Sequence, residues 1–288
     1  MNMPNFLVIG AMKAGTTALY HALKQHPQIY MSPIKEPHFF TYEGEQLNYS
    51  GPVTDLDSYH QLFEPASQGA IKGEVSPSYI YSPKAPERIK HYLPNVKLIA
   101  ILRNPVERAY SNFLMATRQG DETLSFSQAL QQEQQRINNN WGLLWHYQSK
   151  GFYAEQLQRY FSLFDKEQIR IYLYEDWNNN PGSLLQDMFQ FLEVDASFTP
   201  NTDSRHNTSG IPQNKIVKTL VQKTYPMRFI YRRLASQQLR SYFKKQVFSK
   251  PQLSPQLHTK LMDLYREDIL QLQTLLQRDL SSWLEVNE

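Results

Sequence analysis

The chain has 288 residues, of which 41% are hydrophobic and 20% charged, a composition typical of a folded globular protein rather than a disordered one. It contains no cysteine, which excludes disulfides, thiolate metal sites and cysteine nucleophiles, and its net charge is a mild +3. Apolar runs such as LIAIL at 98–102 are too short to cross a bilayer, and the N-terminus lacks the basic region of a signal peptide. We therefore expect a cytoplasmic protein.

Short apolar runs alternate with helical patterns, which predicts βαβ units, a parallel sheet and a single domain over 1–288. The predicted strands cover 6–9, 71–74, 98–102 and 169–174, and the predicted helices cover 15–25, 86–92, 105–117, 153–164 and 181–192. A Gln/Asn-rich stretch over 119–151 predicts a helical insertion. The last long helix is expected to begin with Ser254 as N-cap and Pro255 at its first position. Its apolar positions, which recur at helical spacing, are Leu261, Leu264, Ile269 and Leu270.

The first functional motif is GAMKAGTTAL at 10–19, directly after the apolar run FLVI. A strand, a glycine-bounded loop and a helix form the layout of a phosphate-binding loop. Gly10 and Gly15 keep the glycine spacing of G-x-x-x-x-G-K-[ST], but Thr16 stands where that motif has its lysine. Backbone N–H groups, the Thr16 and Thr17 hydroxyls and the charge of Lys13 together predict phosphate binding.

The second motif, LIAILRNPVERAYSNF at 98–113, again predicts a strand, a turn and a helix. Chemistry on ATP needs Mg²⁺ and an acidic residue at a strand end, but this strand ends in Arg103. A cationic strand end repels a metal ion and attracts a second anion. Ser111 follows eight residues later, about two helical turns on. The two motifs predict a metal-free nucleotide with more than one phosphate site.

GAMKAGTTAL together with ILRNPVERAYS resembles the sulfotransferases that use 3′-phosphoadenosine-5′-phosphosulfate (PAPS). Further resemblance lies in SPIKEPHFF (32–40), GFYAEQLQRYF (151–161), YEDWNNNPGSLLQDMFQFL (174–192) and HNTSGIPQNK (206–215), so that it spans roughly 5–217. It is closest to the glycan and heparan sulfate branch and its bacterial relatives. The resemblance implies a three-layer, P-loop-like α/β fold with a central parallel sheet flanked by helices, followed by a mainly helical, basic extension over 215–288.

The same resemblance assigns the residues that bind PAPS and its product PAP, with no metal required. Lys13, Ala14, Gly15, Thr16 and Thr17 match the loop that holds the 5′-phosphosulfate. Arg103 and Ser111 match the pair that holds the 3′-phosphate. The remaining matches, in a loop expected to close over the nucleotide, are Asn207, Ser209, Gly210 and Lys215.

The reaction would transfer a sulfuryl group to a hydroxyl or amine of an acceptor by in-line displacement. Lys13 is the candidate that stabilises charge on the leaving oxygen. In SPIKEPHFF the resemblance makes Glu36 the general base, with His38 orienting it or binding acceptor. His38 is the alternative base, because imidazole titrates nearest neutral pH. Lys35 is a further cationic contact, and Glu74 is expected to contact the acceptor or to hold a neighbouring cation.

In one respect the sequence departs from the glycan enzymes: Val75 of GEVSPSY stands where they carry a lysine. The geometry around the acceptor is therefore left open. The acceptor is either a glycan or a small molecule, and the sulfated group is either a hydroxyl or an amine. Two other functions stay open beside the sulfotransferase. One is a P-loop kinase acting on a small metabolite, and the other is a non-catalytic nucleotide-binding or membrane-surface adaptor.

The segment from 204 to 262 has no Asp or Glu. We interpret its part over 215–250 as an amphipathic helical pair with a solvated cationic face. A contact with the acceptor or with a membrane surface is the alternative. No nucleic-acid motif accompanies the charge, so we expect no nucleic-acid partner. The oligomeric state is left open. The basic residues are Lys215, Lys218, Lys223, Arg228, Arg232, Arg233, Arg240, Lys244, Lys245 and Lys250.

Overall fold

The computed structural model describes residues 2–47, 50–202, 211–212, 248–249 and 251–285. They form two compact units whose segments alternate along the chain. The first unit comprises the described residues of Met1–Asn104, Phe152–His206 and Glu267–Trp283, and the second those of Pro105–Gly151, Asn207–Arg266 and Leu284–Glu288. A single domain over 1–288 stays a prediction.

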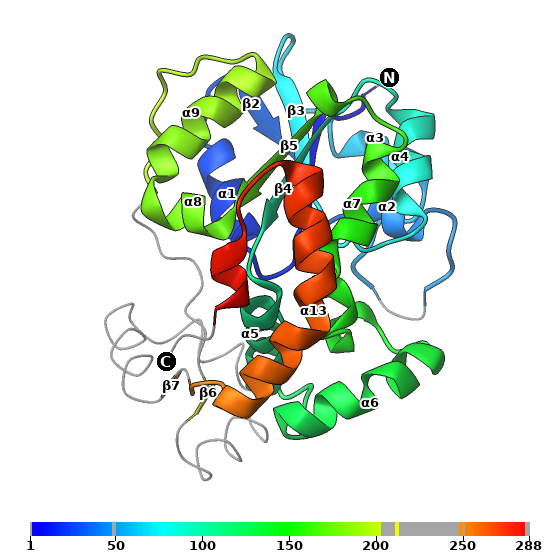
Figure 1. Cartoon of the computed structure of the whole chain (residues 1–288). Helices are drawn as coiled ribbons and strands as arrows, with labels where there is room; N and C mark the ends of the chain where they lie inside the picture. The colour runs from blue at the N-terminus through cyan, green and yellow to red at the C-terminus, as the bar shows by residue number, and fades with distance from the viewer. Residues whose placement is uncertain (1, 48–49, 203–210, 213–247, 250, 286–288) are drawn as a thin grey trace. The chain divides into compact units, whose positions relative to one another are not determined.

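A five-stranded parallel sheet forms the centre of the first unit (Figure 1). Its strands are β1 (Phe6–Gly10), β2 (Ile29–Met31), β3 (Ile71–Val75), β4 (Lys97–Leu102) and β5 (Ile169–Leu173), in the order β2-β3-β1-β4-β5. At its centre Phe6 of β1 pairs with Gly73 of β3 and with Lys97 of β4. Every residue of β1 is buried, as expected of a parallel strand covered on both faces.

Helices flank this sheet on both sides (Figure 1). One side carries α1 (Thr16–Leu23), α8 (Tyr174–Asn179) and α9 (Pro181–Leu192). The other carries α2 (Phe39–Tyr42), α3 (Leu56–Gln61), α4 (Ala85–Tyr92) and α7 (Tyr153–Phe161). The predicted class, an α/β fold with a central parallel sheet flanked by helices, is thereby confirmed. Among the described helices, none has both the length and the hydropathy that a bilayer span requires.

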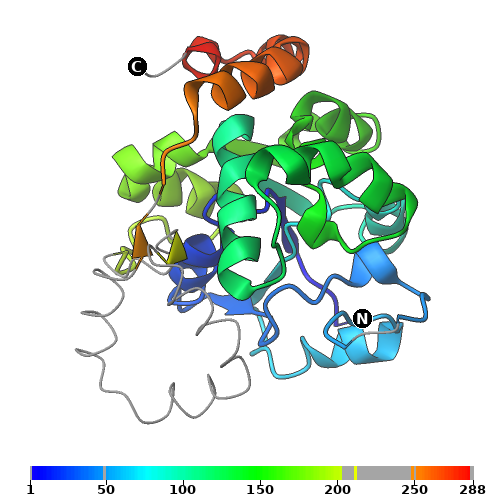
Figure 2. The same cartoon turned by 90° about the horizontal axis from the view of Figure 1, so that it is seen from below.

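The described residues of the second unit are mainly helical (Figure 2). It contains α5 (Pro105–Gln119), α6 (Phe126–Asn138), the short helices η1 (Leu143–Trp145) and η2 (Ser149–Gly151), and an antiparallel pairing of β6 (Ile211–Pro212) with β7 (Phe248–Ser249). Ser125 and Gln128 form a capping box at the start of α6. The predicted helical insertion over 119–151 is thus present as α6 and two short helices.

A buried ion pair stabilises this second unit. The Arg136 Nη1 atom lies 2.5 Å from Glu122 Oε2, and the Tyr147 hydroxyl donates to the same oxygen at 2.9 Å. Burial raises the pKa of Glu122, but the hydrogen bonds from Arg136 and its neighbours outweigh burial and leave the pKa below its usual value. The carboxylate is therefore paired and ionised inside the insertion.

The predicted strands are all present, and each predicted helix has a counterpart that differs by a few residues at its ends. The sequence missed β2, because a three-residue edge strand between Pro27 and Pro33 is too short for a period-2 pattern. The short helices α2 and α3 were also not predicted. Most of the basic segment over 215–250 lies outside the described residues.

The last long helix is α13 (Pro255–Leu276), which begins where the sequence predicts. The backbone N–H of Leu257 donates to the Ser254 hydroxyl at 3.3 Å, as expected of an N-cap. The predicted apolar face was only half right, because Leu264 and Leu270 remain 43% and 42% exposed. The buried positions of α13 are instead Leu261, Met262, Tyr265, Asp268, Ile269 and Leu272. The helix therefore buries a face rotated from the predicted one.

Candidate active site

The loop between β1 and α1 has the geometry of an anion site. Gly15 is the N-cap of α1 with φ +95°, a left-handed conformation that glycine adopts without strain. A Cβ built at this position would meet the Tyr174 ring at 3.2 Å. All eight residues of α1 are described; its first turn has no acidic residue, and no described side chain caps it. The positive end of the helix is therefore suited to an external anion.

Lys13 of this loop and Arg103 of the second motif lie together in the first unit. Lys13 adopts a left-handed backbone conformation with φ +72°. Arg103 follows β4, and its Nη1 donates to the Lys13 carbonyl at 3.4 Å. The Arg103 guanidinium also lies 4.8 Å from the centre of the Tyr174 ring, a cation–π contact that fixes its direction. Thr16 is buried at the start of α1 and Thr17 is half-buried beside it.

The other residues predicted to bind the nucleotide lie in the second unit or outside the described residues. Ser111 is buried on α5 in the second unit, whereas Arg103 belongs to the first. The joint contact of these two residues with a 3′-phosphate stays a prediction. The four residues of the predicted closing loop lie outside the described residues. They are Asn207, Ser209, Gly210 and Lys215.

The loop that connects β2 to α2 contains the candidate base. Glu36 and His38 have φ values of +66° and +56°, backbone conformations that residues other than glycine rarely adopt. The backbone N–H of Glu36 donates to the Val75 carbonyl at 2.9 Å, which ties the loop to the carboxyl end of β3. Strained backbone of this kind persists where surrounding contacts hold it, and it occurs preferentially at functional sites.

Lys35 and His38 face the Glu36 carboxylate. Lys35 Nζ forms an ion pair with Glu36 Oε1, and His38 Nε2 lies 3.5 Å from Glu36 Oε2. Burial raises the pKa of Glu36, but the hydrogen bond with His38 and the charge of Lys35 outweigh burial and lower the pKa to about 2. The Glu36 side chain is 31% exposed, so it is reachable from solvent. The carboxylate is ionised at neutral pH.

His38 is held by the segment that follows β3. Its backbone N–H donates to the Ser76 hydroxyl at 3.0 Å, and its Nδ1 lies 2.7 Å from the Ser78 hydroxyl. Ser78 in turn lies 2.9 Å from the Thr41 hydroxyl. These contacts occupy Nδ1 and leave Nε2 toward Glu36. Ser76 and Ser78 were not predicted as site residues, although both belong to the GEVSPSY stretch in which Val75 replaces the lysine of the glycan enzymes.

Glu74 lies deeper than the sequence suggested. Its side chain is fully buried, and its Oε1 accepts hydrogen bonds from the hydroxyls of Tyr59 at 2.9 Å and Tyr79 at 2.6 Å. The Ser76 hydroxyl donates to Oε2 at 2.7 Å. Burial raises the pKa of Glu74 above its usual value, although these three bonds oppose that effect. Both oxygens are occupied and the side chain has no exposed surface, so its expected contact with the acceptor or with a neighbouring cation stays a prediction.

The two loops meet at one edge of the sheet. β1 and β3 are neighbours, and the segment after β3 is tied to the end of β1 by the bonds from Ser76 N to Val8 O, at 3.1 Å, and from Ile80 N to Ile9 O, at 2.8 Å. In open α/β sheets, ligands bind outside the carboxyl ends of the strands. The phosphate-type loop and the Glu36–His38 loop thus share the edge where a ligand is expected.

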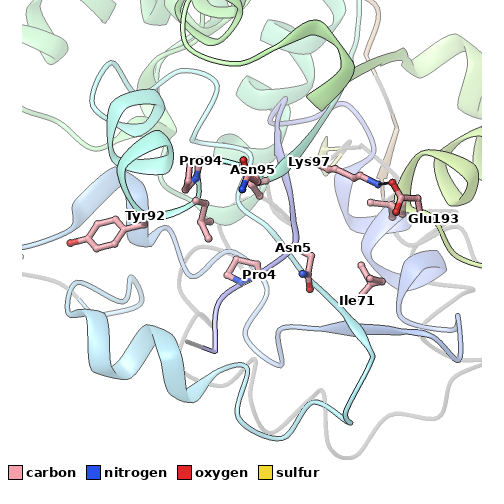
Figure 3. Close-up of a pocket in the computed structure, with 11 residues that line it drawn as sticks. Pro4, Asn5, Ile71, Tyr92, Pro94, Asn95, Lys97 and Glu193 are labelled. Atoms are coloured by element: carbon pink, nitrogen blue, oxygen red, sulfur yellow. Dashed lines mark hydrogen bonds and ion pairs between the residues drawn. The ribbon is translucent and has the colours of Figure 1, made fainter.

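A separate hollow of about 370 Å³ lies at the opposite, amino edge of the same sheet (Figure 3). Asn5, Ile71 and Lys97 line it at or beside the starts of β1, β3 and β4, and Lys97 forms an ion pair with Glu193 at 2.7 Å. None of the candidate site residues lines this hollow. Within the part of the chain that the structure describes, no group of three His, Asp or Glu residues has the arrangement of a metal site.

Comparisons with known proteins show which family the chain resembles. The family model described as "Sulfotransferase domain" matches residues 3–273. Human carbohydrate sulfotransferase 15 is 28% identical over 249 residues, which cover 67% of this chain and 44% of that protein. Mouse heparan sulfate glucosamine 3-O-sulfotransferase 3A1 is 28% identical over 212 residues, which cover 73% of this chain and 51% of that protein. The chain thus spans about half the length of these relatives.

Among solved structures, the crystal structure of a sulfotransferase from Alicyclobacillus acidocaldarius matches with a TM-score of 0.78 and 30% identity, covering 98% of this chain and 99% of that one. The sulfotransferase domain from the curacin biosynthetic pathway matches with a TM-score of 0.50 at 14% identity, which concerns the fold alone. The match to the family model extends over nearly all of the chain, and the bacterial structure matches along its whole length. The chain therefore belongs to the sulfotransferase domain family.

Proposed function

We propose that this sulfotransferase transfers a sulfuryl group from PAPS to a hydroxyl or amine of an acceptor, with Glu36 as the general base. The observation that carries the proposal is the position of an ionised carboxylate, held between Lys35 and His38, at the sheet edge that also presents the loop of Lys13. A proton acceptor and an anion site are the two elements that such a transfer needs.

The residues present fit a nucleotide cofactor with phosphate and phosphosulfate groups. The uncapped α1 N-terminus, the hydroxyl of Thr16 and the charges of Lys13 and Arg103 form a donor set suited to anionic oxygens. PAPS, when bound, supplies the sulfuryl group and leaves as PAP. Lys13 would stabilise the negative charge that develops on the leaving phosphate, and Arg103 and Ser111 would bind the 3′-phosphate.

The charges around Glu36 set a condition on its role as base. With a pKa of about 2, the carboxylate accepts a proton weakly, because base strength falls with pKa. Weakening the contact between Lys35 and Glu36 raises the pKa of Glu36 and makes it a better base. We therefore propose that Lys35 turns from Glu36 toward the anionic cofactor, which leaves His38 as the group that orients the base.

His38 remains the second candidate base, because its Nε2 lies 3.5 Å from Glu36. In that arrangement Glu36 would stabilise the imidazolium that forms when His38 takes the acceptor proton. The two assignments differ in their pH dependence. With His38 as base, turnover requires the neutral imidazole and is lost once that ring takes up a proton. With Glu36 as base, turnover persists to lower pH.

The acceptor is proposed from the relatives. Two of them are named for carbohydrate and for heparan sulfate glucosamine, which makes glycan hydroxyls and amines the first acceptors to test. Small-molecule alcohols and amines are the second group. Val75 stands where the glycan enzymes have a lysine, and it is fully buried beside Glu74. The reaction we propose therefore uses Lys13 and has no lysine at position 75.

The test is sulfuryl transfer from radiolabelled PAPS to a panel of glycan and small-molecule acceptors. Lys13→Ala and Glu36→Gln are expected to lower turnover about 100-fold, and Glu36→Gln is expected to keep the affinity for PAP. Lys84→Ala is the control, because Lys84 pairs with Glu45 on the surface at 2.8 Å. Unchanged turnover in both site variants contradicts the proposal. PAP binding without transfer to any acceptor favours the adaptor, and Mg²⁺-dependent turnover of ATP favours the kinase.

A further inference from the structure

The loop that carries Glu36 and His38 needs an anchor. Both residues have left-handed backbone conformations, which are strained for any residue other than glycine. A strained loop keeps one conformation only if the contacts around it fix it. Three contacts from the end of β3 do this: Val75 O accepts from Glu36 N, while the hydroxyls of Ser76 and Ser78 bond His38. Of these three, the Ser76 contact continues to a buried carboxylate.

Glu74 sets the direction of this chain of hydrogen bonds. The hydroxyls of Tyr59, Tyr79 and Ser76 all donate to its two oxygens. Because the Ser76 hydroxyl proton is committed to Glu74 Oε2, only its lone pairs can face His38. The backbone N–H of His38, 3.0 Å away, is the donor that these lone pairs accept. The buried carboxyl group thus fixes the hydroxyl that holds the strained residue.

We propose that Glu74 is a positioning residue for sulfuryl transfer, acting through Ser76 to hold His38 and Glu36 in the conformation that presents the base. The inference rests on the proposed function of this loop. It also gives a role to a fully buried carboxyl group one residue before the end of β3. Two tyrosines and one serine donate to its oxygens, and one of these three continues to the loop of Glu36 and His38.

The decisive variant is Glu74→Gln, which keeps the size of the side chain but replaces an accepting oxygen by a donating amide. If the new amide faces Ser76, the serine oxygen lies between two donors, the His38 N–H and the glutamine amide. The Ser76 hydroxyl proton then loses the oxygen that accepts it. Ser76→Ala removes the same anchor without changing the buried carboxylate. Tyr172→Phe is the matched control, because it removes a 2.6 Å hydroxyl bond to another carboxylate, Asp187, in the same unit.

Two readouts separate positioning from general loss of structure. In Glu74→Gln and Ser76→Ala we expect turnover to fall about 10-fold to 100-fold, with PAP affinity and the KM for PAPS changed less than about 2-fold. We also expect the acid limb of the turnover profile to move to higher pH. The charged groups that face Glu36 are Lys35 and His38, and loss of the His38 contact raises the pKa of Glu36. The double variant should be no slower than either single one, because both act on one chain of bonds.

Amide hydrogen exchange supplies a measurement that does not need activity. The His38 amide should exchange at least about 10-fold faster in both variants and at an unchanged rate in Tyr172→Phe. Unchanged His38 exchange in both variants overturns the proposal, and so does faster exchange with unchanged turnover. If the unaltered chain transfers nothing from PAPS, the proposed function fails, while the exchange result still decides whether Glu74 holds the loop.

Discussion

Lys35→Ala tests the electrostatics of the candidate base without reference to any substrate. The pKa of Glu36 falls from 4.5 to about 2, and Lys35 and His38 together cause this fall against the opposing effect of burial. A pKa lowered from 4.5 to about 2 corresponds to about 3 kcal/mol of folding free energy. Assigning about half of this to Lys35, we expect Lys35→Ala to cost about 1–2 kcal/mol of stability at neutral pH.

The sign of the pH dependence follows from the lowered pKa. Glu36 stabilises the fold above its unfolded pKa of about 4.5, and this contribution is lost as the pH falls toward 2. The stability difference between the variant and the unaltered chain should therefore be full above pH 5 and shrink steadily toward pH 2. Urea unfolding at several pH values measures it, with Lys84→Ala as the control for a surface lysine that is 60% exposed. A pH-independent difference, or one equal to that of the control, would refute the reasoning.

Three further predictions concern stability elsewhere in the molecule. Gly15→Ala places a side chain at φ +95° and 3.2 Å from Tyr174, so we expect a loss of more than about 1 kcal/mol in urea unfolding and weaker PAP binding by calorimetry. Arg136→Met leaves the buried Glu122 carboxylate without its cation, and should cost about 3–5 kcal/mol in urea unfolding. Burial raises the pKa of Asp268 from 3.8 to about 6, so the unaltered chain should lose up to about 3 kcal/mol as the pH rises through this interval. Asp268→Asn should lack this loss when Tm is measured from pH 3.5 to 6.5.

The phosphate-type loop was predictable because its determinants are local in sequence. Gly15, Lys13 and Thr16 lie within a few residues of each other, and the strand before them is a continuous apolar run. Arg103 was predictable for a similar reason, since it ends a buried strand where the carboxyl edge of a parallel sheet lies. Its stacking on Tyr174 was not, because the two residues are 71 positions apart and no spacing rule connects them.

The network beneath the base was not predictable from sequence. Glu74 was recognised as a strand-end carboxylate, but its burial and its bonds to Tyr59 and Tyr79 depend on how α3 and the segment after β3 pack. Charged residues are seldom fully buried, so the sequence pattern suggested a contact with the acceptor or with a neighbouring cation rather than a place in the core. For α13, Leu264 and Leu270 repeat at helical spacing, but the buried face is chosen by the neighbouring elements rather than by hydropathy alone.

Binding of PAP decides whether the loop after β1 holds a phosphosulfate nucleotide. The measurement is calorimetric titration of the full chain with PAP in EDTA, beside ADP in EDTA and ATP with Mg²⁺. We predict metal-independent binding of PAP, and binding of ADP that is at least about 10-fold weaker, because ADP lacks the 3′-phosphate that Arg103 would hold. Binding of ATP with Mg²⁺ and none of PAP would contradict the assignment and favour a kinase.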